Sequence, residues 1–188
     1  MGTTPTADEL QRRPLYRVEY EALGRQGAFD DEKVELLDGE IVYAAEEGPP
    51  HAAICTRLAR MLFDAIPAGE AEIRVGNPFA LSDLSEPEPD FLVAPPQPDS
   101  YRSGHPASAS LVIEVAETSR GRDLGLKASL YAAGGVPDYW VVDVGRGEIV
   151  VHRDPAGTTF RSITRHRDGI LRALHHSAVV VNVHVLLG

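Results

Sequence analysis

Two short runs of apolar residues constrain the fold of this chain more than any other feature of its sequence. FLVA at residues 91–94 and LVIEVA at residues 111–116 are almost continuously apolar, a pattern typical of strands that are covered on both faces. One acid accompanies each run. Asp90 directly precedes the first, and Glu114 stands inside the second. We therefore expect both runs to be central strands of one sheet.

The position of Glu114 is unusual for a charged residue. Successive side chains of a strand point to opposite faces, so Glu114 shares its face with Val112 and Ala116. The opposite face is expected to hold Leu111, Ile113 and Val115. A carboxylate among apolar neighbours costs several kcal/mol unless a cation or several donors compensate. A structural ion pair with an arginine is one explanation for Glu114, and a turn-capping role before the strand is the corresponding explanation for Asp90.

Lys127 adds a cation on the element that follows Glu114. The spacing predicts a helix over residues 123–133, in which Lys127 shares a face with Tyr131 and can point inward. The alternative is a solvated pair between Lys127 and Asp123, which stand four residues apart. Two acids and a lysine on consecutive elements are nevertheless harder to explain separately than together. The combination favours a divalent-metal site.

The remaining elements complete a mixed α/β architecture. Hydrophobic periodicity and turn residues predict helices over 15–29 and 51–66, strands over 34–37, 40–44, 71–76, 79–81, 138–144, 148–153 and 179–187, and a surface loop over 95–110. A chain of 188 residues without repeats or composition shifts is expected to form one domain over 1–188. The predicted fold is a mixed β-sheet flanked by helices.

Composition restricts the function and the location. A formal net charge of -10 opposes binding to a phosphate polymer, although a small basic groove or bound cations can reverse the local field. The single cysteine, Cys55, excludes an internal disulfide and favours a reducing compartment. We find no signal-peptide core near the N-terminus and no apolar stretch long enough to span a membrane. The expected location is the cytoplasm, with no membrane partner.

Four longer segments contain or surround these residues. They are PEPDFLV, LVIEVAETS and DLGLKASLYAAGGVPDYWVVD, with VELLDGEIVYAAEEGPPHAAICTRLARML in the N-terminal half. Together they resemble the Uma family of restriction-endonuclease-like proteins within the PD-(D/E)XK superfamily, over roughly residues 14–154. The resemblance implies a restriction-endonuclease-like fold in which Asp90 is the PD aspartate and Glu114 the second acid. The lysine of the superfamily pattern would fall at Ala116. The resemblance to this family implies that Lys127, on the following helix, is the candidate replacement.

The resemblance also implies a reaction, the hydrolysis of phosphodiester bonds in DNA with Mg²⁺ or Mn²⁺. Asp90, Glu114 and the carbonyl of Val115 would hold the ion through hard oxygen ligands. Lys127 would orient the attacking water or share the phosphate charge. Nearby carboxylates should keep its pKa high, which favours this electrostatic role over that of a base. Glu35 resembles an additional N-terminal glutamate used by such sites, although exposed pairing is an alternative.

Several further residues are candidates for contacts with substrate. His51 opens a predicted helix, where it could face a phosphate or simply be solvated. Glu88 is a candidate for a supporting acid that lies behind the metal ligands. Possible phosphate contacts, each also explicable as a solvated charge, are Arg57, Arg60, Arg120 and Arg122. The six other histidines lack the spacing of zinc ligands, so we expect no zinc site among them.

Three classes of function follow from these residues. A Mg²⁺-dependent endonuclease acting on DNA is the leading hypothesis, and we expect a homodimer because a symmetric pair can cut both strands of a duplex. A noncatalytic nucleic-acid or protein binding module that retains the fold is favoured by the acidic charge and by Ala116. A glycosidase with paired carboxylates is third, but such a site needs no lysine and usually has an aromatic-lined cleft.

Overall fold

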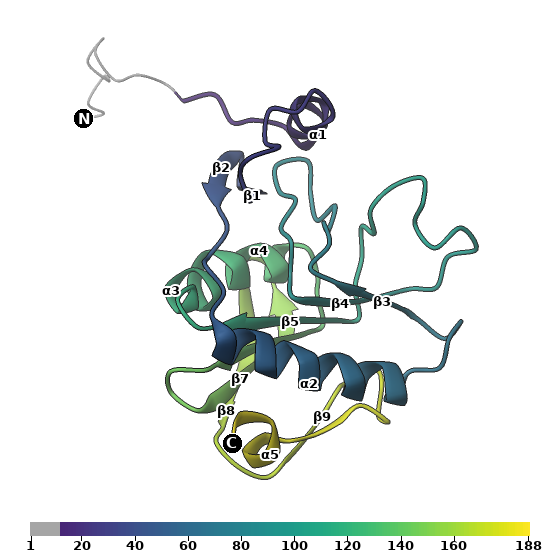
Figure 1. Ribbon diagram of the computed structural model, residues 1–188, viewed down its shortest axis with the longest axis vertical. Coiled ribbons are helices and arrows are strands. Elements are labelled where there is room, and N and C mark those ends of the chain that lie inside the picture. The colour runs from purple at the N-terminus through teal and green to yellow at the C-terminus, as the bar shows by residue number, and fades with distance from the viewer. Residues whose placement is uncertain (1–11) are drawn as a thin grey trace.

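A six-stranded mixed sheet forms the centre of the computed structural model, which describes residues 12–188 (Figure 1). The strand order is β3-β4-β5-β6-β7-β8. The strands are β3 (Glu72–Val75), β4 (Phe91–Ala94), β5 (Leu111–Ala116), β6 (Asp138–Asp143), β7 (Glu148–Ala156) and β8 (Thr159–His166). Strands β5 and β6 run parallel, and the other neighbours in this sheet run antiparallel. The predicted mixed sheet with flanking helices is confirmed.

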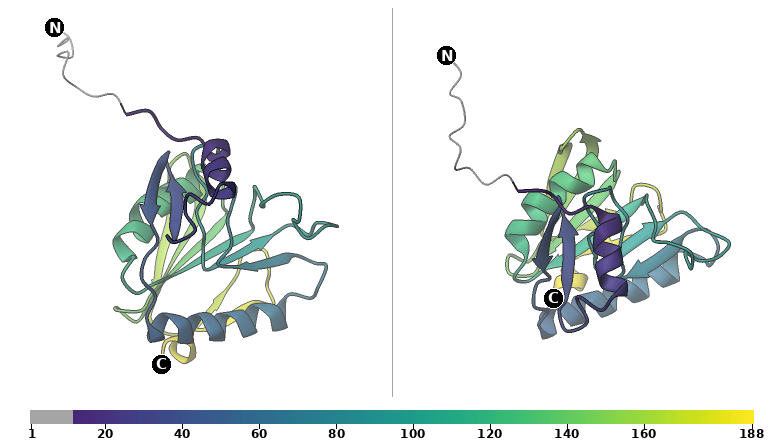
Figure 2. Two further views of the ribbon diagram at one scale, coloured as in Figure 1. Left: turned by 45° about the horizontal axis from the view of Figure 1, so that its top comes forward. Right: turned by 90° about the horizontal axis from the view of Figure 1, so that it is seen from above.

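Both faces of the sheet are covered, which explains the continuous apolar runs in its central strands. Helix α2 (Pro49–Ala65) lies across one face, together with the short C-terminal helix α5 (Val183–Leu187) (Figure 2). The other face packs against α4 (Ala128–Ala133), which follows α3 (Arg120–Arg122) and η1 (Asp123–Lys127) without a break. Strand β5 is therefore buried between two helical layers.

The predicted alternation along β5 is confirmed by these two cores. The core beneath α2 contains Leu111, Ile113 and Val115. Val112 and Ala116 belong instead to the core beneath α4. Glu114 stands between them in sequence and thus starts on the α4 side of the sheet.

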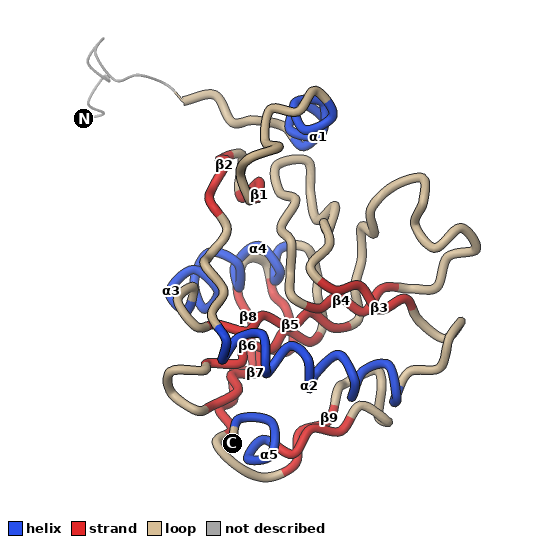
Figure 3. Tube along the Cα trace, in the orientation of Figure 1, coloured by secondary structure: helices blue, strands red, loops and turns tan. Residues whose placement is uncertain are grey.

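A hairpin outside the main sheet brings the N-terminal part of the chain to the end of β5. Strands β1 (Val34–Leu37) and β2 (Glu40–Tyr43) pair around Asp38 and Gly39, as predicted (Figure 3). Both turn residues have positive φ, 52° and 79°, the left-handed conformation that the Asp-Gly turn requires. All four residues of β1 are buried, so this strand is the inner one of the hairpin.

The helix expected over residues 123–133 begins earlier and contains a wider turn. It starts at Arg120, and its residues Asp123–Lys127 form the π-helical turn η1. Such turns insert one extra residue into a helix and are frequent at functional sites. Lys127 is the last residue of this turn.

Two expectations for the N-terminal half need correction. The helix expected over residues 15–29 is the shorter α1 (Arg17–Arg25), and the chain turns away at Gly27, whose φ is +80°. Residues 79–81 do not form a strand. The N–H groups of Phe79 and Ala80 bind the carbonyls of Pro87 and Pro106 in neighbouring loops, so they are not available to a strand partner.

The C-terminal prediction was wrong in part. Only β10 (Val180–Asn182) of the expected strand 179–187 is extended, and it pairs with β9 (Ile170–Arg172). Helix α5 follows because the Asn182 side chain accepts a hydrogen bond from the Val185 N–H and so caps the helix. Strands β8 and β9 were not predicted at all. The polar, exposed sequence of β8 carries little of the hydrophobic signal on which strand prediction depends.

None of the helices within residues 12–188 is long and apolar enough to cross a membrane. Residues 1–11, on which part of the signal-peptide argument rests, lie outside the described residues.

Glu86 contacts strand β1 of the hairpin, and its buried carboxyl group allows the stability of this region to be tested. Its N–H donates to the Leu36 carbonyl, while its side-chain Oε2 is buried without a hydrogen-bond partner in the described part of the chain. Burial and then the charge of Glu21 raise the pKa of Glu86 to about 7. A carboxyl pKa that is higher in the folded than in the unfolded chain stabilises the fold at low pH, and this contribution is lost as pH rises through about 7.

We therefore expect the free energy of unfolding to fall between pH 5 and pH 8 by more in the wild type than in Glu86→Gln. Urea unfolding at several pH values measures this difference. Glu40→Gln is the control, because Glu40 lies exposed on the same hairpin and forms only a surface pair with Arg12. Equal pH dependence of the wild type and Glu86→Gln would contradict the conclusion that burial in the folded chain raises the pKa of Glu86.

Candidate active site

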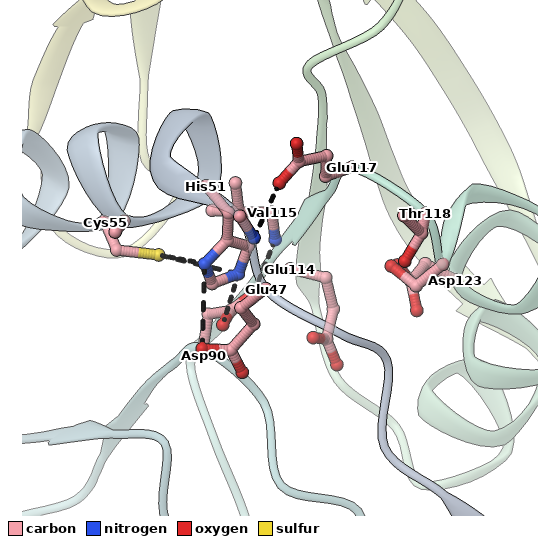
Figure 4. Close-up of polar contacts among 12 residues, drawn as sticks. Glu47, His51, Cys55, Asp90, Glu114, Val115, Glu117, Thr118 and Asp123 are labelled. Atoms are coloured by element: carbon pink, nitrogen blue, oxygen red, sulfur yellow. Dashed lines mark hydrogen bonds and ion pairs between the residues drawn. The ribbon is translucent and has the colours of Figure 1, made fainter.

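Asp90 directly precedes β4, and Glu114 lies on the neighbouring strand β5, so both acids are near the same end of this strand pair. In the antiparallel pair of β4 and β5, Phe91 stands opposite Ile113. Asp90 lies one residue before this pairing, in a bend rather than in the strand. Its carboxylate contacts His51 of α2, whereas Glu114 contacts Lys127 on the α4 side of the sheet, and both acids line one cavity. The Asp90 carboxylate is fixed at this point, because its Oδ2 accepts a hydrogen bond of 2.6 Å from the Val115 N–H (Figure 4).

Lys127 forms buried ion pairs with Glu114 and Glu35. Its Nζ lies 3.0 Å from Oε1 of Glu114 and 2.8 Å from Oε1 of Glu35. The hydroxyl of Tyr131, one turn further along the helix, donates to the same Glu114 oxygen at 2.8 Å. Lys127 thus points inward, as predicted, and its burial excludes the solvated pair with Asp123. The cation that compensates Glu114 is this lysine rather than an arginine.

The electrostatics of this cluster keep Lys127 charged. Burial raises the pKa of Glu114 to about 8, against the opposing effect of Lys127. Burial lowers the pKa of Lys127, but Glu114 and then Glu35 outweigh it and hold that pKa above its ordinary value. Lys127 is therefore an ammonium ion, suited to stabilising negative charge rather than to accepting a proton. A pKa of about 8 leaves Glu114 largely protonated at neutral pH, so a metal ion that binds this residue would displace its proton.

His51 is buried against Asp90 rather than free at the end of its helix. It lies in the first turn of α2, where Pro49 and Pro50 begin the helix, and its Nε2 is 3.0 Å from Oδ1 of Asp90. The hydrogen bond to Asp90, and then the contact with Cys55, raise the pKa of His51 to about 10. The imidazolium therefore pairs with Asp90 and holds the carboxylate in place.

One acidic cavity contains most of the predicted site residues. Asp90, Glu114, Val115 and Lys127 line it, and so do Glu35 and His51. Its wall carries three permanently cationic side chains, Lys33, Arg122 and Lys127. The eight acids of the wall are Glu35, Glu46, Glu47, Glu88, Asp90, Glu114, Glu117 and Asp123. The cavity is thus strongly negative, and a phosphate could enter it only with cations bound.

Two further acids lie close to the cluster. Asp123 is buried, with Oδ2 accepting a hydrogen bond from Ser119 and Oδ1 unpaired among the described residues. Burial raises the pKa of Asp123. The backbone N–H of Glu88 donates to Oε1 of Glu35 at 2.7 Å, and burial followed by Glu35 raises the Glu88 pKa. Glu88 thus lies beside the site, as expected. Sequence reasoning considered Asp123 only as a surface partner of Lys127, because the π-turn that buries it has no simple sequence signal.

Two of the candidate phosphate-binding arginines form contacts away from the cavity. Arg57 donates to the Leu186 carbonyl at 2.7 Å and so attaches α5 to α2. The Nε of Arg120 lies 2.5 Å from Oδ2 of the buried Asp143. Neither Arg57 nor Arg120 lines the cavity, whereas Arg122 does.

Comparison with known proteins identifies the family of this chain. The family model of Uma2, described as "Putative restriction endonuclease", matches residues 17–175. The chain therefore belongs to the Uma2 family, and the resemblance predicted from residues 14–154 is confirmed. A comparison with the curated proteins gave no match.

A solved structure supports the same fold. The crystal structure of a "putative nuclease belonging to DUF820" from Anabaena variabilis ATCC 29413 is similar to this chain with a TM-score of 0.72. The two sequences are 16% identical, and the match covers 93% of this chain and 98% of that chain. At this identity the similarity establishes the fold alone. Family and fold together indicate a nuclease-type protein.

The buried ion pairs predict a large effect of removing Lys127 on stability. Lys127→Ala would leave Glu35 and Glu114 buried without their cation, which costs roughly 3–5 kcal/mol. Lys33→Ala is a matched control, because Lys33 lines the same cavity but its pair with Glu47 is exposed and should contribute about 0–1 kcal/mol. Urea unfolding measures both. Similar losses in the two variants would contradict the importance of the buried cluster.

Proposed function

We propose that this chain is a divalent-metal-dependent endonuclease that hydrolyses phosphodiester bonds in DNA. Its family and its nuclease-like fold support a nuclease-type function. The observation that supports the finer proposal is that Asp90, Glu114 and Lys127 line one acidic cavity, with Lys127 paired to Glu114. A symmetric homodimer, which would present two such cavities to the two strands of a duplex, is part of the proposal.

The donor set fits Mg²⁺ or Mn²⁺. Both ions prefer hard oxygen ligands, and Asp90 and Glu114 supply carboxylates at one cavity. Each Asp90 oxygen already accepts one hydrogen bond, but a carboxylate has about four lone-pair positions and can accept more. Lys127 and Tyr131 both bind Oε1 of Glu114, so Oε2 is available. The Val115 carbonyl is the proposed third ligand.

The residues of the site would have two roles, the binding of the metal ion and the stabilisation of negative charge on the phosphate. A bound Mg²⁺ or Mn²⁺ would polarise the scissile phosphate and lower the pKa of a bound water. Lys127, held protonated between Glu114 and Glu35, would stabilise the negative charge that develops on the phosphate. His51 would position Asp90 through the Nε2 contact. Glu35 acts through Lys127 and is a positioning residue in this proposal.

A noncatalytic binding module is the second candidate. It is favoured by the net charge of -10 and by Ala116 at the superfamily's lysine position. The glycosidase hypothesis has less support, because no Trp, Tyr or Phe among residues 12–188 lines the acidic cavity. Such enzymes usually bind sugars in an aromatic-lined cleft.

Metal binding gives the first test of this proposal. Millimolar Mg²⁺ or Mn²⁺ should raise the melting temperature of metal-free protein, because an ion that binds only the folded state stabilises it by about 2.7 kcal/mol at 100 times its dissociation constant. Asp90→Asn should remove this gain. Glu46→Gln changes the same charge at an exposed position of the cavity wall and should retain it. Calorimetry showing identical melting temperatures with and without metal would argue against the site.

Cleavage of supercoiled plasmid distinguishes the enzyme from the binding module. The wild type with Mn²⁺ should nick or linearise the plasmid, and faster at low salt, because the attraction of the phosphates to bound metal and to cationic side chains such as Arg122 is then screened less. Glu114→Gln should abolish cutting while retaining an acceptor for Lys127 and Tyr131, and Glu46→Gln should cut at the wild-type rate. Unchanged plasmid with Mg²⁺, Mn²⁺ and low salt, under conditions where metal is bound, would favour the binding module.

A further inference from the structure

Three donors of different chemistry converge where α2 begins. His51, Cys55 and Asp90 each offer one ligand atom, and these atoms all lie within 4.8 Å of one another. His51 and Cys55 stand four residues apart on α2, so their side chains share one helical face. Figure 4 shows the Cys55 sulfur and the Asp90 carboxylate both directed at the His51 ring.

The spacing of these atoms suits a small tetrahedral ion. The Cys55 Sγ lies 3.8 Å from His51 Nε2, which in turn lies 3.0 Å from Oδ1 of Asp90. Zinc binds sulfur at about 2.3 Å and nitrogen or oxygen at about 2.0–2.2 Å, so tetrahedral ligand atoms are roughly 3.3–3.6 Å apart. The two separations from His51 Nε2 are within a few tenths of an ångström of these values, and the ligand atoms of Cys55 and Asp90, which lie within 4.8 Å of each other, would approach one another to close the site around an ion. His51 and Asp90 line the cavity, which supplies the route of entry.

We propose that His51 Nε2, Cys55 Sγ and Asp90 form a second metal site, selective for Zn²⁺ and similar borderline-soft ions. A thiolate and an imidazole select such ions over Mg²⁺, which prefers oxygen ligands alone. Binding replaces the proton on His51 Nε2 and the thiol proton of Cys55 by the metal, and both protons pass to solvent. The fourth position is left to water, as is usual for zinc held by three protein ligands.

The site shares Asp90 with the proposed Mg²⁺ or Mn²⁺ site. An ion held by His51 and Cys55 would draw Oδ1 of Asp90 towards α2 and away from Glu114. Zn²⁺ should therefore inhibit the nuclease by capturing one of its ligands. Zinc binding itself is independent of the proposed function, whereas the inhibition rests on it.

Cobalt provides a spectroscopic probe of the site, because Co²⁺ replaces Zn²⁺ in such sites and a bound thiolate gives it a near-ultraviolet charge-transfer band. Cys55 is the single cysteine of the chain, so any such band in reduced protein identifies its ligand. We expect the band to saturate at one Co²⁺ per chain and to disappear when Zn²⁺ is added. Cys55→Ser should abolish it, and Asp90→Asn and His51→Gln should weaken Co²⁺ binding about 10-fold or more. Melting curves establish that each variant is folded.

Two spectroscopic results would overturn the proposal. One is the absence of a thiolate band in the folded wild type. The other is saturation at one Co²⁺ per two chains, which would indicate a sulfur shared between molecules. These outcomes are read without any cleavage assay, so they remain decisive even if the chain is not a nuclease.

The inhibition is tested separately, by titrating Zn²⁺ into the plasmid assay at constant Mn²⁺. The Zn²⁺ concentration that halves cleavage should be about 10-fold or more higher for Cys55→Ser than for the wild type, while cleavage without Zn²⁺ is unchanged. Equal sensitivity of the two proteins would show that Zn²⁺ acts elsewhere. If the wild type cuts nothing with Mn²⁺ alone, the proposed function fails, and the cobalt spectrum still decides the zinc site.

Discussion

The rest of the structure depends on the buried contact of Lys127 with Glu35 and Glu114. These three residues come from the outer hairpin, the central strand β5 and the helix that covers it. Each charge is acceptable in the interior only because the others are present. The same contact fixes the hairpin against the sheet, orients Glu114 through one oxygen and keeps an ammonium ion at the cavity. Stability and the proposed chemistry therefore have a common physical basis.

The sequence predicted the centre of this arrangement better than its edges. The apolar runs of β4 and β5 are buried on both faces, so their hydrophobic pattern was unambiguous, and two acids stood out, Asp90 just before β4 and Glu114 within β5. Lys127 was identified by helical spacing. The roles of Cys55 and Asp123 were missed, because Cys55 meets Asp90 only in the folded chain and Asp123 is buried by a π-turn. The contact of Arg57 was not predicted, because its partner, the Leu186 carbonyl, is distant in sequence.

The acidic character of the chain has a local explanation. Carboxylates are concentrated at the cavity, where they outnumber the cationic side chains. A metal site requires such an excess, since bound cations reverse the local field that a phosphate would meet. The net charge of -10 is thus compatible with a nuclease whose substrate binding depends on metal. It also implies that the protein without metal should bind DNA weakly, because the cavity would then repel the phosphates.

Anomalous diffraction from crystals soaked in Mn²⁺ tests the central claim most directly, because it locates the ion without relying on activity. The account predicts a single strong peak in the cavity, within about 2.0–2.6 Å of oxygens from both Asp90 and Glu114, with Lys127 still beside Glu114. A peak that contacts only one of these acids, or ions found solely at exposed carboxylates such as Glu46, would contradict it.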